Sequence, residues 1–198
     1  MREVKGSKMD ISYAVGSFPT LSNKDFDWIQ RFRAKHDMWY ELIDPHFTLV
    51  FPGRLEKTSY INHIRRLAMG VPKFDFTIRC ALTVPGNTPG DISHVFLIPD
   101  KGFSDIVKLH DRLYTDMLSS KLALEIPFYP HIGIANSIEI YACKKLADEI
   151  NELNFTIEGV VDTIDIVEIV ASERVSTEVE NAVSTIRSIK SIDRIELA

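Results

Sequence analysis

The sequence predicts an α+β fold in which two similar lobes form one domain spanning residues 1–198. Segments with strand-like and helix-like apolar periodicity alternate along the chain, and its length of 198 residues suits a single domain. In addition, two strands that open on a proline-histidine pair, at residues 45–51 and 129–135, occupy matching places in the two halves. We therefore interpret the chain as a bilobal domain that arose by duplication.

The first half is predicted to contain three strands and two helices. The strands are expected at residues 11–15, 45–51 and 74–82, and the helices at 23–35 and 58–69. Alternation is clearest in the third strand, where Phe74, Phe76 and Ile78 are separated by polar residues. We expect Asn23 to cap the first helix and Gly70 to end the second.

The second half repeats the same order of periodicities. Strands are expected at residues 93–98, 129–135, 155–161 and 164–170, and helices at 103–119, 138–153 and 177–190. The spacing supports a duplication, because Ile11 precedes His46 by 35 residues and Val95 precedes His131 by 36. Each half therefore places one histidine at the start of the corresponding strand.

Composition excludes several classes of function. The chain carries 23 Lys and Arg against 28 Asp and Glu, a net charge of −5, which argues against a partner such as extended nucleic acid. Cys80 and Cys143 are too few for a disulfide framework or a four-cysteine zinc site, and they favour a reducing cytoplasm. Because apolar runs reach only four or five residues, we expect no signal peptide and no membrane partner.

The two proline-histidine strands offer a pair of titratable groups. Side chains alternate along a strand, so His46 and Thr48 share one face, and His131 shares a face with Gly133 and Tyr129. If the lobes pack about a twofold axis, the imidazoles face each other across a cleft. One neutral and one charged histidine can then act as general base and general acid at a phosphodiester. No metal-ligand spacing such as His-x-x-x-His is present, so the expected chemistry needs no metal.

These strands resemble the signature of the two-histidine (2H) phosphoesterase superfamily, which includes 2′,5′ RNA ligase-like proteins and cyclic nucleotide phosphodiesterases. That signature is one His-x-Thr/Ser-apolar tetrad in each lobe. Here the tetrads are His46-Phe-Thr-Leu49 and His131-Ile-Gly-Ile134, each directly after a proline. The resemblance extends over nearly the whole chain.

The resemblance implies a fold and an activity. The fold would have two mainly antiparallel sheets flanking a central cleft, with helices on the outside. The activity would be metal-independent hydrolysis of a 2′,3′-cyclic phosphate or a 2′–5′ linkage of a small nucleotide or RNA end, without a cofactor and by a monomer. His46 and His131 would be catalytic, and Thr48, Gly133 and Tyr129 would contact the substrate. The alternative direction of similar chemistry is 2′–5′ RNA ligation.

Gly133 departs from the family pattern, because it lacks the hydroxyl that contacts phosphate in the second tetrad. Its backbone amide or the Tyr129 hydroxyl could replace that donor. Loss of one such donor typically costs about 2.7–4 kcal/mol of transition-state stabilisation. A nucleotide- or phosphate-binding protein without turnover is therefore an open alternative. Four other histidines are expected to be non-catalytic: His36, His63, His94 and His110. Phe18 and Phe128 are expected in the core rather than stacked on a base, and Arg54 is expected to be a solvated loop residue rather than a phosphate contact.

Overall fold

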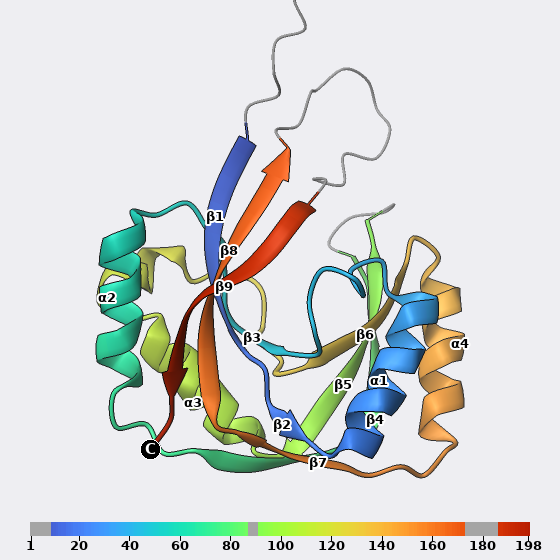
Figure 1. Ribbon diagram of the computed structural model, residues 1–198. Helices are drawn as coiled ribbons and strands as arrows, with labels where there is room; N and C mark the ends of the chain where they lie inside the picture. The colour runs from blue at the N-terminus through green and yellow to red at the C-terminus, as the bar shows by residue number, and fades with distance from the viewer. Residues whose placement is uncertain (1–8, 87–90, 173–185) are drawn as a thin grey trace, which may run out of the picture.

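Nine strands form one antiparallel sheet in the computed structural model, which describes residues 9–86, 91–172 and 186–198 (Figure 1). Across the sheet the strands follow the order β2-β7-β4-β5-β6-β3-β1-β8-β9, and each pairing is antiparallel. The predicted α+β class is confirmed. In chain order the strands are β1 (Met9–Ser17), β2 (Thr20–Leu21), β3 (Phe47–Gly53), β4 (Phe74–Val84), β5 (Ser93–Lys101), β6 (Ile132–Ser137), β7 (Ile157–Val161), β8 (Thr163–Ser172) and β9 (Ile186–Glu196).

The helices lie outside the sheet in two groups, as the sequence predicts. Helices α2 and α3 lie beside the half that contains β3, and α1 and α4 lie beside the half that contains β6 (Figure 1). A short 3₁₀ helix follows α3. The bounds are α1 (Asn23–His36), α2 (Lys57–Ala68), α3 (Phe103–Leu113), the 3₁₀ helix (Asp116–Lys121) and α4 (Ile140–Asn151). Among the described residues, no helix has the length and apolar character needed to cross a membrane.

The two halves of the sheet meet at a narrow joint between β3 and β6. Only Phe47 and Ile132 pair there, and both side chains are buried. Phe47 also packs edge to face against Phe76 of β4, with ring centroids 5.1 Å apart and an interplanar angle of 89°. The two predicted lobes are therefore two halves of one hydrogen-bonded sheet, and their apolar cores meet at this joint.

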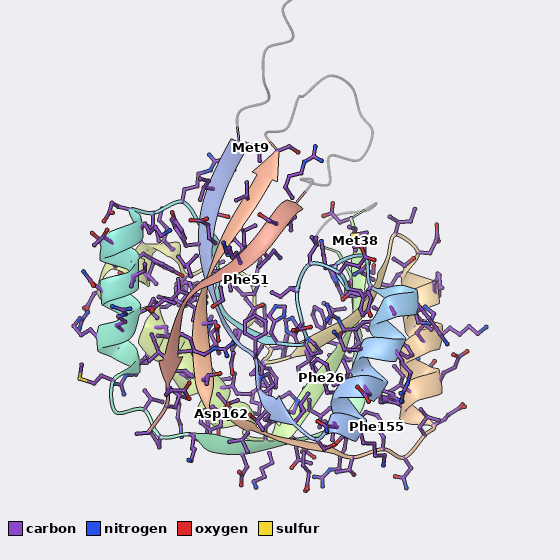
Figure 2. The ribbon with its side chains drawn as sticks, in the orientation of Figure 1. Met9, Phe26, Met38, Phe51, Phe155 and Asp162 are labelled. Carbon is purple, nitrogen blue, oxygen red and sulfur yellow. The ribbon has the colours of Figure 1, made fainter. Side chains whose placement is uncertain are left out.

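The lobes do not correspond to the two halves of the chain. Helix α1 and strand β4 come from the first half but lie with β6, whereas α3, β8 and β9 lie with β3. The ring of Phe155, just before β7, stacks on Trp28 of α1 with centroids 5.8 Å apart. Figure 2 shows Phe155 beside the end of α1, in the β6 half. Strand β4 pairs with β5 because the antiparallel hairpin is the shortest connection available to it. Each lobe is therefore assembled from both halves of the chain.

Several predicted element boundaries were wrong. Residues 186–190 were expected in a helix, but they belong to β9, and residues 177–185 of that helix lie outside the described residues. The isoleucines of β9 recur every three positions, as on one face of a helix, and register shifts in the β8–β9 pairing accommodate this spacing within a strand. Helix α3 ends at Leu113, before Asp116 adopts a positive φ of 50°. The cap of α1 is Ser22, whose hydroxyl accepts the Asp25 N–H at 3.1 Å.

Candidate active site

The β3–β6 joint brings the two tetrads together. Because Phe47 and Ile132 point into the core, the residues on either side of each point to the opposite face of the sheet. That face therefore carries four half-buried residues, two from each motif: His46, Thr48, His131 and Gly133. The alternation predicted from the sequence thus holds for both tetrads.

Each catalytic candidate is held by the backbone carbonyl two residues before it. The Nδ1 atom of His46 lies 2.8 Å from the Asp44 carbonyl oxygen, and Nδ1 of His131 lies 2.6 Å from the Tyr129 carbonyl oxygen. A carbonyl only accepts hydrogen bonds, so Nδ1 carries the hydrogen in both rings. Consequently Nε2 is the nitrogen that can take up or release a proton.

The prolines explain why both histidines adopt the same arrangement. Pro45 and Pro130 are buried, and each lies between a histidine and the residue that supplies its carbonyl. A proline ring restricts its own φ and disfavours helical conformation in the residue before it. The Xaa-Pro-His sequence therefore favours one local backbone path, and this path directs the carbonyl of Xaa to Nδ1.

Partial burial lowers the pKa of both imidazoles below the usual value of 6.5. The pKa of His131 falls to about 4, because burial outweighs the hydrogen bond to Tyr129, and the nearby imidazoles of His46 and His94 lower it further. For His46, burial also outweighs the hydrogen bond to Asp44 that favours its charged form. At pH 7 both rings are therefore mostly neutral in the free protein.

The second half of the site replaces a hydroxyl with an aromatic ring. Thr48 on β3 is paired with Gly16 on β1, whereas Gly133 on β6 is paired with Phe96 on β5. A Cβ atom added at Gly133 would lie 3.9 Å from Cε1 of Phe96, so the Phe96 ring packs over the glycine. In the first half the glycine of this pair lies on the neighbouring strand β1, whereas in the second half the glycine lies on the tetrad strand β6 and the larger residue lies on β5.

The exchanged phenylalanine also covers His131. The Phe96 and His131 rings stack with centroids 3.6 Å apart and an interplanar angle of 13°. On the other half-site the nearest aromatic contact of His46 is looser, with the Phe18 ring 5.5 Å away at 38°. Apolar contact on one ring face removes water from His131, which is the physical cause of its depressed pKa.

Two residues that sequence reasoning did not place in the site extend this stack away from the joint. His94, expected to be non-catalytic, lies 5.3 Å from Phe96, and Trp39 lies 5.8 Å from His94, both at interplanar angles near 20° or below. Four rings from three segments therefore follow one another, ending in His131. Alternation along β5 places His94 and Phe96 on one face, but nothing in the sequence indicates that β5 lies next to β6.

Tyr129 contributes its backbone to the site. It precedes β6, so the strand alternation that placed its side chain beside His131 does not extend to it. The side chain is 49% exposed, and the carbonyl holds the imidazole. Of the remaining candidates, Phe128 stacks on the buried His110 at 3.7 Å, and Arg54 pairs with Asp10. No group of three or more metal-ligating side chains occurs within residues 9–86, 91–172 and 186–198.

Known proteins are similar to this chain in sequence and in fold. The model of the 2′-5′ RNA ligase superfamily matches residues 21–173. A protein of Halalkalibacterium halodurans named "Putative phosphoesterase BH1439" is 25% identical over 162 residues, covering 79% of this chain and 88% of the relative. A Bacillus pumilus protein named "Putative phosphoesterase" is 27% identical over 131 residues, covering 65% of this chain and 71% of the relative.

Solved structures agree with the sequence comparison. Crystalline LigT of E. coli complexed with 3′-AMP superposes with a TM-score of 0.53 at 15% identity, covering 94% of this chain and 97% of LigT. The protein TT0787 of Thermus thermophilus gives a TM-score of 0.57 at 15% identity with the same two coverages. At such low identity these likenesses establish the LigT-like fold alone. The match of the family model over residues 21–173, more than half of the chain, places the protein in the 2′-5′ RNA ligase superfamily of 2H phosphoesterases.

Proposed function

We propose that the protein is a metal-independent phosphodiesterase that hydrolyses a 2′,3′-cyclic phosphate or a 2′–5′ linkage of a small nucleotide or RNA end. The observation that carries this proposal is the repeated Xaa-Pro-His unit. It presents two imidazoles from one face of the β3–β6 joint, each with Nδ1 bound to a carbonyl. The relatives named as phosphoesterases support the reaction class, and the LigT complex with 3′-AMP supports a small nucleotide.

In the proposed reaction the two Nε2 atoms work on opposite sides of the phosphorus. One neutral imidazole takes a proton from water, whose oxygen forms the new P–O bond. The other, protonated imidazole gives its proton to the ribose oxygen as the old P–O bond breaks. The product is a phosphomonoester with a free hydroxyl, and exchange with solvent restores the two protonation states. Thr48 would donate a hydrogen bond to a phosphate oxygen, and the backbone at Gly133 or the Tyr129 hydroxyl would supply the second contact.

A second candidate is binding without turnover, and Gly133 is the observation that favours it. The Phe96 ring packs over the position where the family has a hydroxyl, so phosphate would have one side-chain donor fewer. Ligation through a 2′–5′ linkage is the reverse direction of similar chemistry. Both alternatives can be tested with the same set of nucleotides.

The experiment measures hydrolysis of 2′,3′-cyclic nucleotides and short 2′–5′ oligonucleotides by the purified protein, with and without EDTA. We expect activity to persist in EDTA and to fall by roughly 10²- to 10⁴-fold in His46→Ala and in His131→Ala, the usual contribution of a positioned acid or base. His63→Gln is the matched control, because His63 is buried on α2 beside the Leu113 carbonyl, away from both tetrads.

The outcomes separate the candidates. Loss of activity in EDTA that a divalent ion restores contradicts the metal-independent reaction. Binding of a nucleotide that needs both histidines, without any product, supports the binding protein. Joining of a cyclic-phosphate end to a 5′-hydroxyl end, in excess over hydrolysis, supports the ligase. Equal losses in His63→Gln and the two site variants would mean that the histidines act through folding alone.

A further inference from the structure

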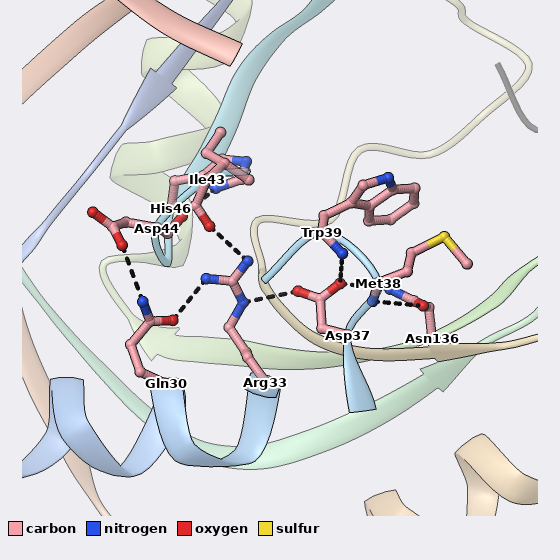
Figure 3. A network of polar contacts seen from close by, with 9 residues as sticks. All are labelled: Gln30, Arg33, Asp37, Met38, Trp39, Ile43, Asp44, His46 and Asn136. Atoms are coloured by element: carbon pink, nitrogen blue, oxygen red, sulfur yellow. Dashed lines mark hydrogen bonds and ion pairs between the residues drawn. The ribbon is translucent and has the colours of Figure 1, made fainter. Parts of the chain in front are cut away.

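A buried guanidinium ties the chain segment before His46 to helix α1 (Figure 3). The side chain of Arg33 is 2% exposed and donates three hydrogen bonds. Its Nε donates to Oδ2 of Asp37 at 2.8 Å, its Nη1 to Oε1 of Gln30 at 2.9 Å, and its Nη2 to the carbonyl oxygen of Ile43 at 2.7 Å. The last of these bonds reaches the segment between α1 and β3, three residues before His46.

Asp44, whose carbonyl oxygen binds the His46 imidazole, is itself hydrogen-bonded to helix α1. Gln30 accepts from Arg33 and, through Nε2, donates to Oδ1 of Asp44 at 3.0 Å. Asp44 then accepts the Nδ1 hydrogen of His46 with its carbonyl oxygen. Helix α1 thus fixes Ile43 through Arg33 and Asp44 through Gln30, the two residues before the proline-histidine pair.

The same ion pair also reaches the strand of the other histidine. Oδ1 of Asp37 accepts the Nδ2 hydrogen of Asn136 at 2.6 Å and the backbone hydrogen of Trp39 at 3.0 Å. In return, Oδ1 of Asn136 accepts the backbone hydrogen of Met38 at 3.2 Å. Asn136 lies on β6, the strand that follows His131. Figure 3 shows this chain of contacts from Gln30 to Asn136.

We propose that the buried Arg33–Asp37 pair positions the His46 imidazole through the Ile43–Asp44 segment and links that segment to the strand of His131 through Asn136. The inference deepens the proposed function and rests on it for the role of His46 in proton transfer. A buried ion pair is often no more stabilising than apolar residues of the same volume. Core stability alone therefore does not explain why an ion pair is buried at this place. The directional hydrogen bonds from Arg33 to the segment before His46 do explain it.

Electrostatics makes the proposal testable, because the two partners act on His46 with opposite signs. The positive charge of Arg33 lowers the pKa of His46, and the carboxylates of Asp37 and Asp44 raise it. The other titratable neighbour is the His131 imidazole, whose own pKa His46 lowers. Removing Arg33 should therefore raise the pKa of His46, and neutralising Asp37 should lower it, although either change breaks the same ion pair.

The experiment compares Arg33→Met, Asp37→Asn and Arg33→Lys by NMR titration of the His46 imidazole and by the pH dependence of kcat. We expect the pKa of His46 to move up in the first variant and down in the second. Arg33→Lys keeps the charge but loses the planar fork, so it should leave the pKa nearly in place. All three should lower kcat by about 10- to 100-fold with little change in KM, since small misplacements have effects of that size.

Two further variants separate positioning from folding. Gln30→Leu keeps the Arg33–Asp37 ion pair and removes both bonds of the Gln30 side chain, the one it donates to Asp44 and the one it accepts from Arg33. It should therefore lower kcat less than Arg33→Met and shift the protein's unfolding midpoint less. Arg65→Lys is the matched control, because Arg65 is also an arginine paired with an aspartate: it donates two hydrogen bonds to Asp193, between α2 and β9. We expect kcat and the His46 titration to be unchanged in this control.

The NMR readout needs no substrate, so the inference and the proposed function can fail separately. If the wild-type protein hydrolyses nothing, the proposed function is wrong, and the His46 titrations still decide the present proposal. Equal pKa shifts of the same sign in Arg33→Met and Asp37→Asn, or no shift in either, would overturn it. It would also be overturned if Gln30→Leu and Arg33→Lys kept the wild-type kcat, because the fork and its extension to Asp44 would then have no positioning role.

Discussion

The depressed pKa of His131 predicts a specific loss of stability in acid. Its usual pKa of 6.5 applies to the unfolded chain, and in the folded protein it is about 4. Between these values the unfolded state binds more protons, so acid favours unfolding. The free energy of unfolding therefore keeps its full value above pH 6.5, where His131 is neutral in both states, and it decreases as the pH falls to about 4. At about 1.36 kcal/mol for each pH unit between the two pKa values, the loss is about 3 kcal/mol.

The assay compares chemical unfolding of the wild-type protein and His131→Gln at pH 7.5 and at pH 4. Carboxylates titrate in both proteins, and their contribution cancels in the difference. We expect the wild type to lose about 3 kcal/mol more than the variant over this interval. Phe96→Ala should reduce the excess, because removal of the stacked ring lets water reach the imidazole. Equal acid sensitivity of the wild type and His131→Gln would refute the burial of His131.

The remaining predictions concern the reaction. Because burial lowers the pKa of both His46 and His131 below 6.5, kcat/KM should be greatest below pH 6.5, and a pH-rate series checks this. Thr48→Ala should lower kcat by roughly 10²- to 10³-fold, the usual effect of removing one donor to developing charge, and Thr48→Ser should retain most activity. Gly133→Thr should raise kcat by about 10-fold or more, since its Cβ would make only an ordinary contact with Phe96, and Gly133→Ala, which adds no donor, should not. A gain in the alanine variant would show that backbone restriction, not the hydroxyl, limits turnover.

The parts of the site that depend on local sequence could be predicted. A proline before each histidine restricts the backbone over three residues, and strand alternation assigns the faces of the next residues. His46, Thr48, His131 and Gly133 therefore lie on one face as expected. Strand alternation does not fix the direction of the Tyr129 side chain, because β6 begins three residues later, and its substrate contact stays a proposal.

The parts that depend on strand order could not be predicted from the pattern. The packing of Phe96 over Gly133 requires β5 to lie beside β6, and periodicity carries no information on neighbours in a sheet. The same holds for the bonds of Arg33. In the sequence Arg33 occupies an ordinary charged position of a helix, and its burial depends on the segment before β3, which packs over it. The helix predicted over residues 177–190 is wrong at residues 186–190 for a related reason, since these residues pair with β8 and periodicity does not indicate that partner.

The exchange of glycine between neighbouring strands gives the two half-sites different physical properties. On the first, Thr48 beside Gly16 keeps a hydroxyl, while charged groups on α1 and in the following segment act on His46. On the second, Gly133 beside Phe96 has no hydroxyl, and an apolar ring covers one face of His131. A site with less water strengthens each remaining electrostatic contact to a phosphate. In the proposed reaction the Phe96 ring would therefore offset part of the cost of the missing donor, while the His131 imidazole holds its proton less tightly. The two Xaa-Pro-His motifs would then contribute unequally to one site.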